Sequence, residues 1–217
     1  MRYGPRAPGL DIYFYDNPKS LFYALVNNEI DLMDWPLSYE QYWEAVNNSD
    51  IILTSQIRRL DVYQLALNNN FTVPIYPNVR NPLNNVSFRK AITFMVDKDY
   101  YIHNLLHRFG DRIDVPIPYP LKDWWNESVV GPNYPYPYDP AKATAILDAA
   151  GFDDWDGDGI RNYPIDWPGA EGQIGVRDEP NLDPLIFWAR NDLGWAVINA
   201  SRQLCSTMRS LGIPVDY

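Results

Sequence analysis

The carboxylates with the clearest capacity for chemistry lie in the run Asp154-Trp155-Asp156-Gly157-Asp158-Gly159. Acidic residues at alternate positions followed by glycine open many calcium-binding loops, because a hard cation prefers several carboxylate oxygens. Ile165 occupies the twelfth position of such a loop, where a glutamate would complete the ligand set. Asn162 or Asp166 could instead complete a looser shell together with a main-chain oxygen. The run therefore predicts either a structural calcium site, with ligands Asp154, Asp156, Asp158 and Asn162, or a plain acidic turn.

The other residue patterns that could take part in chemistry do not support catalysis. His103 and His107 are four residues apart in a stretch with helical periodicity, so we expect a shared face. A zinc protease needs glutamate directly after the first histidine, and Asn104 stands there, so we interpret the two histidines as a surface pair. The sequence contains no glycine-rich phosphate loop, nucleophile elbow or cysteine pair. We therefore predict a protein that is not an enzyme and that needs no cofactor beyond the calcium considered above.

Composition narrows the class of partner. The 217 residues carry a formal charge of −10, whereas nucleic-acid binding needs clustered Lys and Arg, so we expect no nucleic-acid partner. We expect no signal peptide and no membrane-spanning segment within these residues, because no apolar run reaches the length that either would need. Its single cysteine, Cys205, has the spacing of a core thiol. The 15% aromatic content, much of it in proline-rich stretches, suits either a ligand-contacting surface or loops that pack their own rings.

The elements that must position these residues follow from periodicity. Alternating residues predict strands at 10–15, 29–33, 51–56 and 61–68. Between them, Asn17-Pro18 begins one helix, and Ser38 with Gln41 forms a capping box for a second. The first third therefore has the order β-α-β-α-β-β, and the asparagine run 68–70 predicts a crossing between lobes.

The remaining two thirds are dominated by helices. Apolar residues in 86–96 and 102–109 predict two helices or one bent helix, with Asp97 or Asp99 capping the second part. Residues 111–138 are long, rich in proline and aromatic residues, and without periodicity, which is typical of a functional loop or one packed across another surface. Asp139 predicts the start of a helix that ends at Gly151. Residues 185–189, 195–211 and 213–217 predict a strand, a helix and a parallel strand.

Several short motifs occur in the order and spacing of a known family. They are Asn28-Glu29-Ile30-Asp31, residues 63–69 ending in paired asparagines, Val86-Ser87-Phe88-Arg89-Lys90-Ala91-Ile92 followed by Val96-Asp97-Lys98, residues 136–150, and Leu211-Gly212-Ile213-Pro214-Val215. Over residues 10–217 the chain resembles the family 5 extracellular solute-binding proteins, the oligopeptide and dipeptide receptors of ABC importers. The resemblance implies an α/β fold of type II periplasmic-binding-protein-like lobes, with mixed sheets flanked by helices. Because members are longer, it also implies a fragment of a longer protein.

The resemblance also implies that the chain contributes to two lobes. Residues 1–69 would belong to the hinge-bearing lobe and residues 70–217 to the second α/β lobe. The solute, an oligopeptide in the first instance, would bind between the lobes and be delivered to the permease of an ABC importer. The protein would then act outside the cytoplasm, extracellular or periplasmic, tethered at the outer side of the cytoplasmic membrane. Two alternatives stay open: a carbohydrate-binding receptor on the same scaffold and, less favoured, a glycoside hydrolase with two carboxylates across a cleft.

Cleft residues are expected at strand ends and in lobe-crossing segments. Asp34 and Trp35 follow the predicted strand 29–33, and Tyr63 and Gln64 lie near the predicted crossing. Asp34 could pair with a solute amine or be a solvated turn carboxylate. Trp124 and Trp125 could stack on a solute or hold their long loop against the lobe, and we favour the second role. The predicted ligand-binding residues are Asp34, Trp35, Tyr63, Gln64, Trp124 and Trp125.

Overall fold

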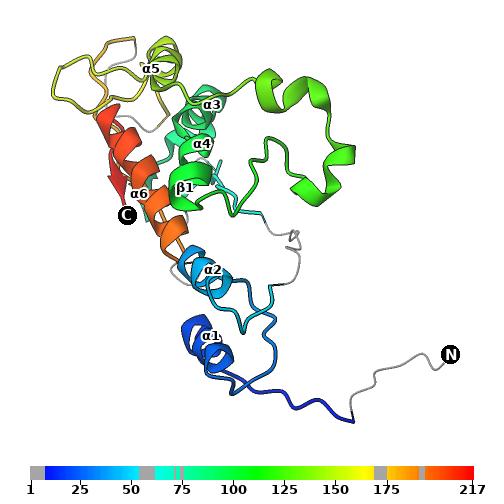
Figure 1. Cartoon of the computed structure of the whole chain (residues 1–217). Helices are drawn as coiled ribbons and strands as arrows, with labels where there is room; N and C mark the ends of the chain where they lie inside the picture. Colours follow the sequence, from blue (N-terminus) through cyan, green and yellow to red (C-terminus); the bar gives the residue numbers. More distant parts are fainter. Residues whose placement is uncertain (1–7, 54–61, 71, 74–75, 169–174, 191–193) are drawn as a thin grey trace. The chain divides into compact units, whose positions relative to one another are not determined.

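A computed structural model describes residues 8–53, 62–70, 72–73, 76–168, 175–190 and 194–217, and gives no side-chain environment for 72–79. The chain divides into two compact units, Met1–Ile57 and Arg58–Tyr217. Figure 1 shows the elements in chain order. The lobe boundary at residues 69 and 70 that the sequence suggests stays a prediction.

Unit 1 consists of two short helices and the segments around them. Helix α1 (Pro18–Val26) begins where the Asn17 side chain accepts a hydrogen bond from the Ser20 amide at 2.8 Å. Helix α2 (Tyr39–Val46) begins with the predicted capping box: the Ser38 hydroxyl accepts from the Gln41 amide, and the Gln41 side chain accepts from the Ser38 amide. Both helices and their N-terminal signals are therefore confirmed.

The strands predicted for the first third are wrong over the residues that the structure describes. Residues 10–15, 29–33, 51–53 and 62–68 carry no strand assignment, while 54–56 and Asp61 lie outside the described residues. Alternation of apolar and polar residues selects a strand only when a neighbouring chain supplies the hydrogen-bond ladder. These segments keep the alternating pattern without such a neighbour among the described residues.

The first two strands of unit 2 form an antiparallel pair that the sequence did not indicate. Strand β1 (Thr72–Val73) pairs with β2 (Tyr76–Arg80), and the register shifts between Thr72 and Val73. A short 3-10 helix, η1 (Pro82–Asn84), follows. The buried Asn81 amide donates to the carbonyls of Asn68 and Asn70 at 2.8 and 2.6 Å. The asparagine run is thus fixed to the end of this strand pair.

The predicted bent helix is present, divided at Asp97. Helix α3 (Val86–Met95) is capped by Asn85. Helix α4 (Lys98–Tyr100) is capped by Asp97, whose side chain accepts from the Tyr100 amide at 2.8 Å, and it continues as one π-helical turn, η2 (Tyr101–Leu105). The second helical part ends four residues before the predicted end at Phe109, and His107 (φ 47°) has a left-handed backbone beyond it. The prediction that His103 and His107 share a helical face is therefore wrong.

The C-terminal part of unit 2 follows the predicted order. After three 3-10 turns, η3 (Tyr119–Trp124), η4 (Glu127–Val129) and η5 (Gly131–Asn133), helix α5 (Pro140–Ala149) starts at Asp139 as predicted. Strand β3 (Leu185–Ile186) pairs in parallel with β4 (Val215–Asp216), and α6 (Trp195–Ser210) connects them. Both strands are shorter than predicted. The predicted parallel pair is confirmed.

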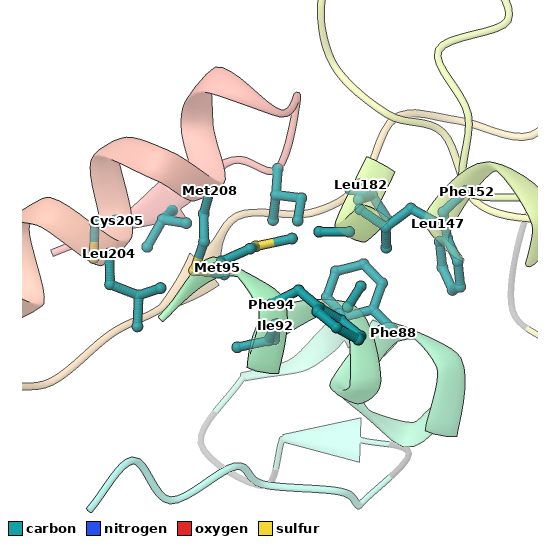
Figure 2. Packing of buried hydrophobic residues seen from close by; sticks show 14 of the residues in the cluster. Phe88, Ile92, Phe94, Met95, Leu147, Phe152, Leu182, Leu204, Cys205 and Met208 are labelled. Atoms are coloured by element: carbon teal, nitrogen blue, oxygen red, sulfur yellow. The ribbon is translucent and has the colours of Figure 1, made fainter. Parts of the chain in front are cut away.

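The core of unit 2 lies where α3, α5 and α6 meet (Figure 2). Phe88 and Met95 of α3 are fully buried, and the Phe88 ring packs edge-on against Phe152 with centroids 4.9 Å apart. Cys205 of α6 is buried in the same cluster, as predicted for a core thiol. Burial raises the pKa of the Cys205 thiol, because a thiolate is poorly solvated there.

Candidate functional site

The residues predicted to contact solute are accessible but lie in different units. Asp34 and Trp35, in unit 1, are exposed, with 52% of Trp35 accessible. Tyr63 and Gln64, in unit 2, are also exposed, with 61% of Tyr63 accessible. Exposure is what a ligand contact requires in the absence of ligand, but it is common in turns as well. The role of these four residues in binding stays a prediction.

Trp124 and Trp125 have different environments although they are adjacent. Trp125 is half-buried, donates from its indole nitrogen to the Ile117 carbonyl at 3.0 Å and packs edge-on against Tyr119. Trp124 is 79% exposed. Trp125 therefore holds its segment together, and Trp124 offers a free aromatic face.

A charged cluster fixes the long segment 111–138 to α4. The Asp114 carboxylate, 4% exposed, accepts from Lys98 at 2.9 Å, from Arg112 at 3.1 Å and from the Gly131 amide at 2.9 Å. The Lys98 ammonium also lies 4.0 Å from the centre of the Tyr134 ring. Burial by itself would raise the pKa of Asp114, but the hydrogen bonds from Lys98, Gly131 and Arg112 outweigh it and lower that pKa below its ordinary value.

The acidic turn brings three of its four predicted metal ligands together. Asp154, Asp156 and Asp158 are exposed, and one carboxylate oxygen from each lies within 4.8 Å of the others. Asp154 accepts from the amides of Gly157 and Gly159 at 2.8 and 3.0 Å, so backbone dipoles already offset part of its charge. This arrangement is compatible with a bound cation and also with a turn stabilised by its own amides.

Asn162, the fourth predicted ligand, is buried and already engaged. Its side-chain oxygen accepts from the Trp155 amide at 3.2 Å, and its nitrogen donates to Asn181 at 2.8 Å and to the Glu179 carbonyl at 3.3 Å. Only a second lone pair on the oxygen remains for a metal. Asn162 thus orders the turn, and its metal role stays a prediction.

Arg161 and Tyr163 flank Asn162 and connect distant segments, a role that sequence reasoning missed. Arg161, 6% exposed, donates to the Leu211 carbonyl at 2.6 Å, to the Asp148 carboxylate at 2.6 Å and to the Phe152 carbonyl. The buried Tyr163 hydroxyl donates to the Arg80 carbonyl at 2.7 Å, and burial raises its pKa. Nothing in local periodicity identifies such residues, because their partners are far away in the sequence.

A pocket of about 370 Å³ lies beside the parallel strand pair, and periodicity alone does not predict it. The only local signal is the spacing of Ile198 and Arg202, four residues apart on one face of α6. Its lining residues are Phe187, Trp188, Ala189, Ile198, Arg202 and Tyr217.

Comparison with known proteins identifies the family. The profile of the bacterial extracellular solute-binding proteins, family 5, matches residues 4–193. The chain belongs to this family. None of the curated proteins compared with it matches.

Solved structures agree with a type II periplasmic-binding-protein-like fold for this family 5 chain. NikA from Brucella suis, solved with Fe(III)-EDTA, is 23% identical with a TM-score of 0.57, covering 93% of this chain and 35% of NikA. Lactococcal OppA, in complex with an endogenous peptide in the closed conformation, is 16% identical with a TM-score of 0.57, covering 91% of this chain and 34% of OppA. The chain therefore spans about a third of the length of these two proteins. Within the described residues, no helix is long and apolar enough to cross a membrane.

Proposed function

We propose that this chain forms part of a receptor that captures oligopeptide between two lobes, outside the cytoplasm, and delivers it to the permease of an ABC importer. The observation that carries the proposal is the family 5 profile match over residues 4–193. A peptide complex of lactococcal OppA, which has a similar fold, supports peptide as the solute. The NikA complex with Fe(III)-EDTA shows that a similar fold also accepts a metal chelate, so the solute has to be tested directly.

The proposed mechanism is a population shift between open and closed lobes. A solute that contacts both lobes favours the closed state by its differential affinity for that state. The exposed Asp34 carboxylate would pair with a peptide amine, and the neighbouring Trp35 ring would cover apolar side chains. The chain spans about a third of the length of NikA and OppA. The 217 residues alone should therefore bind peptide weakly or not at all.

The decisive experiment is a thermal-shift screen of the natural protein that contains these 217 residues. The ligands are a pool of short peptides, a pool of linear oligosaccharides and a nickel–histidine chelate. We expect the peptides to raise Tm, because a ligand at 100 times its Kd stabilises by about 2.7 kcal/mol. Asp34→Asn should reduce the peptide shift, and Asp123→Asn, another exposed carboxylate, should not.

The screen also distinguishes the alternatives. A shift with oligosaccharides and none with peptides would replace the peptide receptor by a carbohydrate receptor, for which exposed tryptophans provide stacking faces. Release of reducing sugar from the oligosaccharides would instead support a glycoside hydrolase. Absence of a shift with every ligand would contradict the receptor proposal.

We also propose that the acidic turn binds a structural calcium ion through Asp154, Asp156 and Asp158, with Asn162 contributing its side-chain oxygen. The three neighbouring carboxylates repel each other, and a divalent cation would offset that repulsion. Calcium should therefore raise Tm, EDTA should lower it, and Asp156→Asn should abolish the difference. If calcium has no effect and Asp156→Asn raises Tm, the turn is held by its backbone hydrogen bonds alone.

A further inference from the structure

The pocket beside β3 and β4 has the composition of a binding site for an organic anion. Phe187, Trp188 and Tyr217 provide aromatic surface, and Arg202 provides a positive charge. The rings of Phe187 and Tyr217 are in tilted contact, with centroids 5.9 Å apart. Trp188 is 77% exposed, so its face is available to a ligand. A volume of about 370 Å³ is within the range of small-molecule pockets.

The position of the pocket in the fold is that of many ligand sites. Leu185 pairs with Val215 and Ile186 with Asp216, and the Phe187 amide donates to the Asp216 carbonyl at 2.8 Å. Phe187 and Trp188 follow the carboxyl end of β3, and Tyr217 follows the carboxyl end of β4. Ligands of open α/β sheets bind outside the carboxyl ends of parallel strands. The pocket occupies this position, beside the first half of the connecting helix α6.

Arg202 is the group that defines the ligand chemistry. It is exposed, and among the described residues its guanidinium has no carboxylate partner. Asp216 directly precedes the pocket residue Tyr217. Alternation along β4 directs the side chains of these two residues to opposite faces, so the Asp216 carboxylate points away from the pocket. An arginine without an acidic partner beside aromatic rings recognises a planar anion, because the guanidinium donates two parallel hydrogen bonds to a carboxylate.

We propose that this pocket binds a carboxylate attached to an aromatic body, with the carboxylate on Arg202 and the ring among Phe187, Trp188 and Tyr217. Two sources have this chemistry: a free aromatic acid, and the C-terminal residue of a peptide that ends in an aromatic side chain. The site is built from residues 187–217 of unit 2, so it does not depend on the proposed capture of peptide between lobes.

Calorimetric titration of the natural protein that contains these 217 residues tests the proposal with four probes. They are 3-phenylpropionate, its neutral amide, Gly-Gly-Phe and Gly-Gly-Phe amide. We expect at least one acid to bind saturably and its amide to bind about tenfold more weakly or not at all, since a charged hydrogen bond is lost. Binding of phenylpropionate alone identifies a free acid as the source, and binding of Gly-Gly-Phe alone identifies a peptide terminus.

Substitutions then locate the site. Arg202→Gln should lower the affinity for the acid about tenfold. Lys90→Gln, which removes one exposed positive charge from α3, should leave that affinity unchanged. Trp188→Ala should also lower the affinity for the acid. The control Trp124→Ala should not, although Trp124 is 79% exposed and Trp188 77%. Equal binding of acid and amide, equal affinity in Arg202→Gln and Lys90→Gln, or no binding by either acid would overturn the proposal.

Discussion

The two units have similar fractions of apolar residues but bury them to different extents. In unit 2, the apolar residues of α3 meet two other helices, and Phe88, Ala91 and Met95 are completely buried. In unit 1, Leu10, Phe14 and Ile52 remain 77%, 94% and 90% exposed. Helical periodicity buries a stripe as soon as a second helix packs against it, whereas alternation buries a face only after a sheet has formed. The difference therefore lies in the partners that each pattern requires.

The largest expected effect comes from the core of unit 2. Phe88→Ala removes a fully buried ring that packs against Phe152 and should lower the free energy of unfolding by about 3–5 kcal/mol. Val86→Ala, in the same helix but 68% exposed, is the matched control and should change it by less than about 0.5 kcal/mol. Urea unfolding followed by circular dichroism measures both. Similar losses in the two variants would contradict a packed core around α3 in unit 2.

The charged cluster around Asp114 should have the next largest effect. Asp114→Asn should destabilise unit 2 by about 1–3 kcal/mol at pH 7, because the acceptor shared by Lys98 and Arg112 loses its negative charge. Since the folded pKa of Asp114 is lowered, its stabilisation is complete above the unfolded value of about 3.9 and is lost as the pH falls further.

Stability curves from pH 7 to pH 2 check this dependence. The wild-type protein should lose more stability on acidification than Asp114→Asn. The control Asp123→Asn, an exposed carboxylate in the same segment, should follow the wild type. Parallel curves for wild type and Asp114→Asn would show that the cluster does not hold the long segment.

A smaller effect is expected in unit 1. Ser38→Ala breaks the capping box of α2 and should reduce stability by about 1 kcal/mol, because the Gln41 amide loses its acceptor. Helicity measured by circular dichroism should fall at lower temperature than in the control Ser49→Ala, which is exposed and outside the helix. Identical melting of the two variants would mean that tertiary packing, and not local capping, holds unit 1.

The smallest effect should come from the exposed apolar residues of unit 1. Phe14→Ser should change the free energy of unfolding by less than about 0.5 kcal/mol, because the side chain is 94% exposed. Binding of an apolar fluorescent dye should decrease, since exposed apolar patches bind such dyes. A large loss of stability in Phe14→Ser would show that unit 1 has a core including this residue.

Sequence reasoning succeeded where a signal and its partner are close together. Asn17, Ser38 and Asp139 each cap a helix at the predicted position, and Asp97 is one of the two caps predicted for α4, because a cap is a contact over two or three residues. Alternation in residues 10–15 failed, because a strand depends on a distant partner. For the candidate sites, the cluster of Asp154, Asp156 and Asp158 is local and was found. The pocket of Trp188 and Arg202 needs the parallel pairing of β3 with β4, which periodicity does not specify in enough detail.

The network of Arg161 has a consequence for how unit 2 opens. One guanidinium connects the end of α5, the chain after it and the end of α6, and the Arg161 amide donates to the Gly212 carbonyl at 2.8 Å. Gly212 (φ 79°) lies so close that an added β-carbon would be 3.1 Å from Arg161 Cγ. Separating either helix end breaks the contacts of both, so hydrogen exchange should give the backbone amides of Arg161 and Ile213 the same free energy of opening, through one cooperative opening.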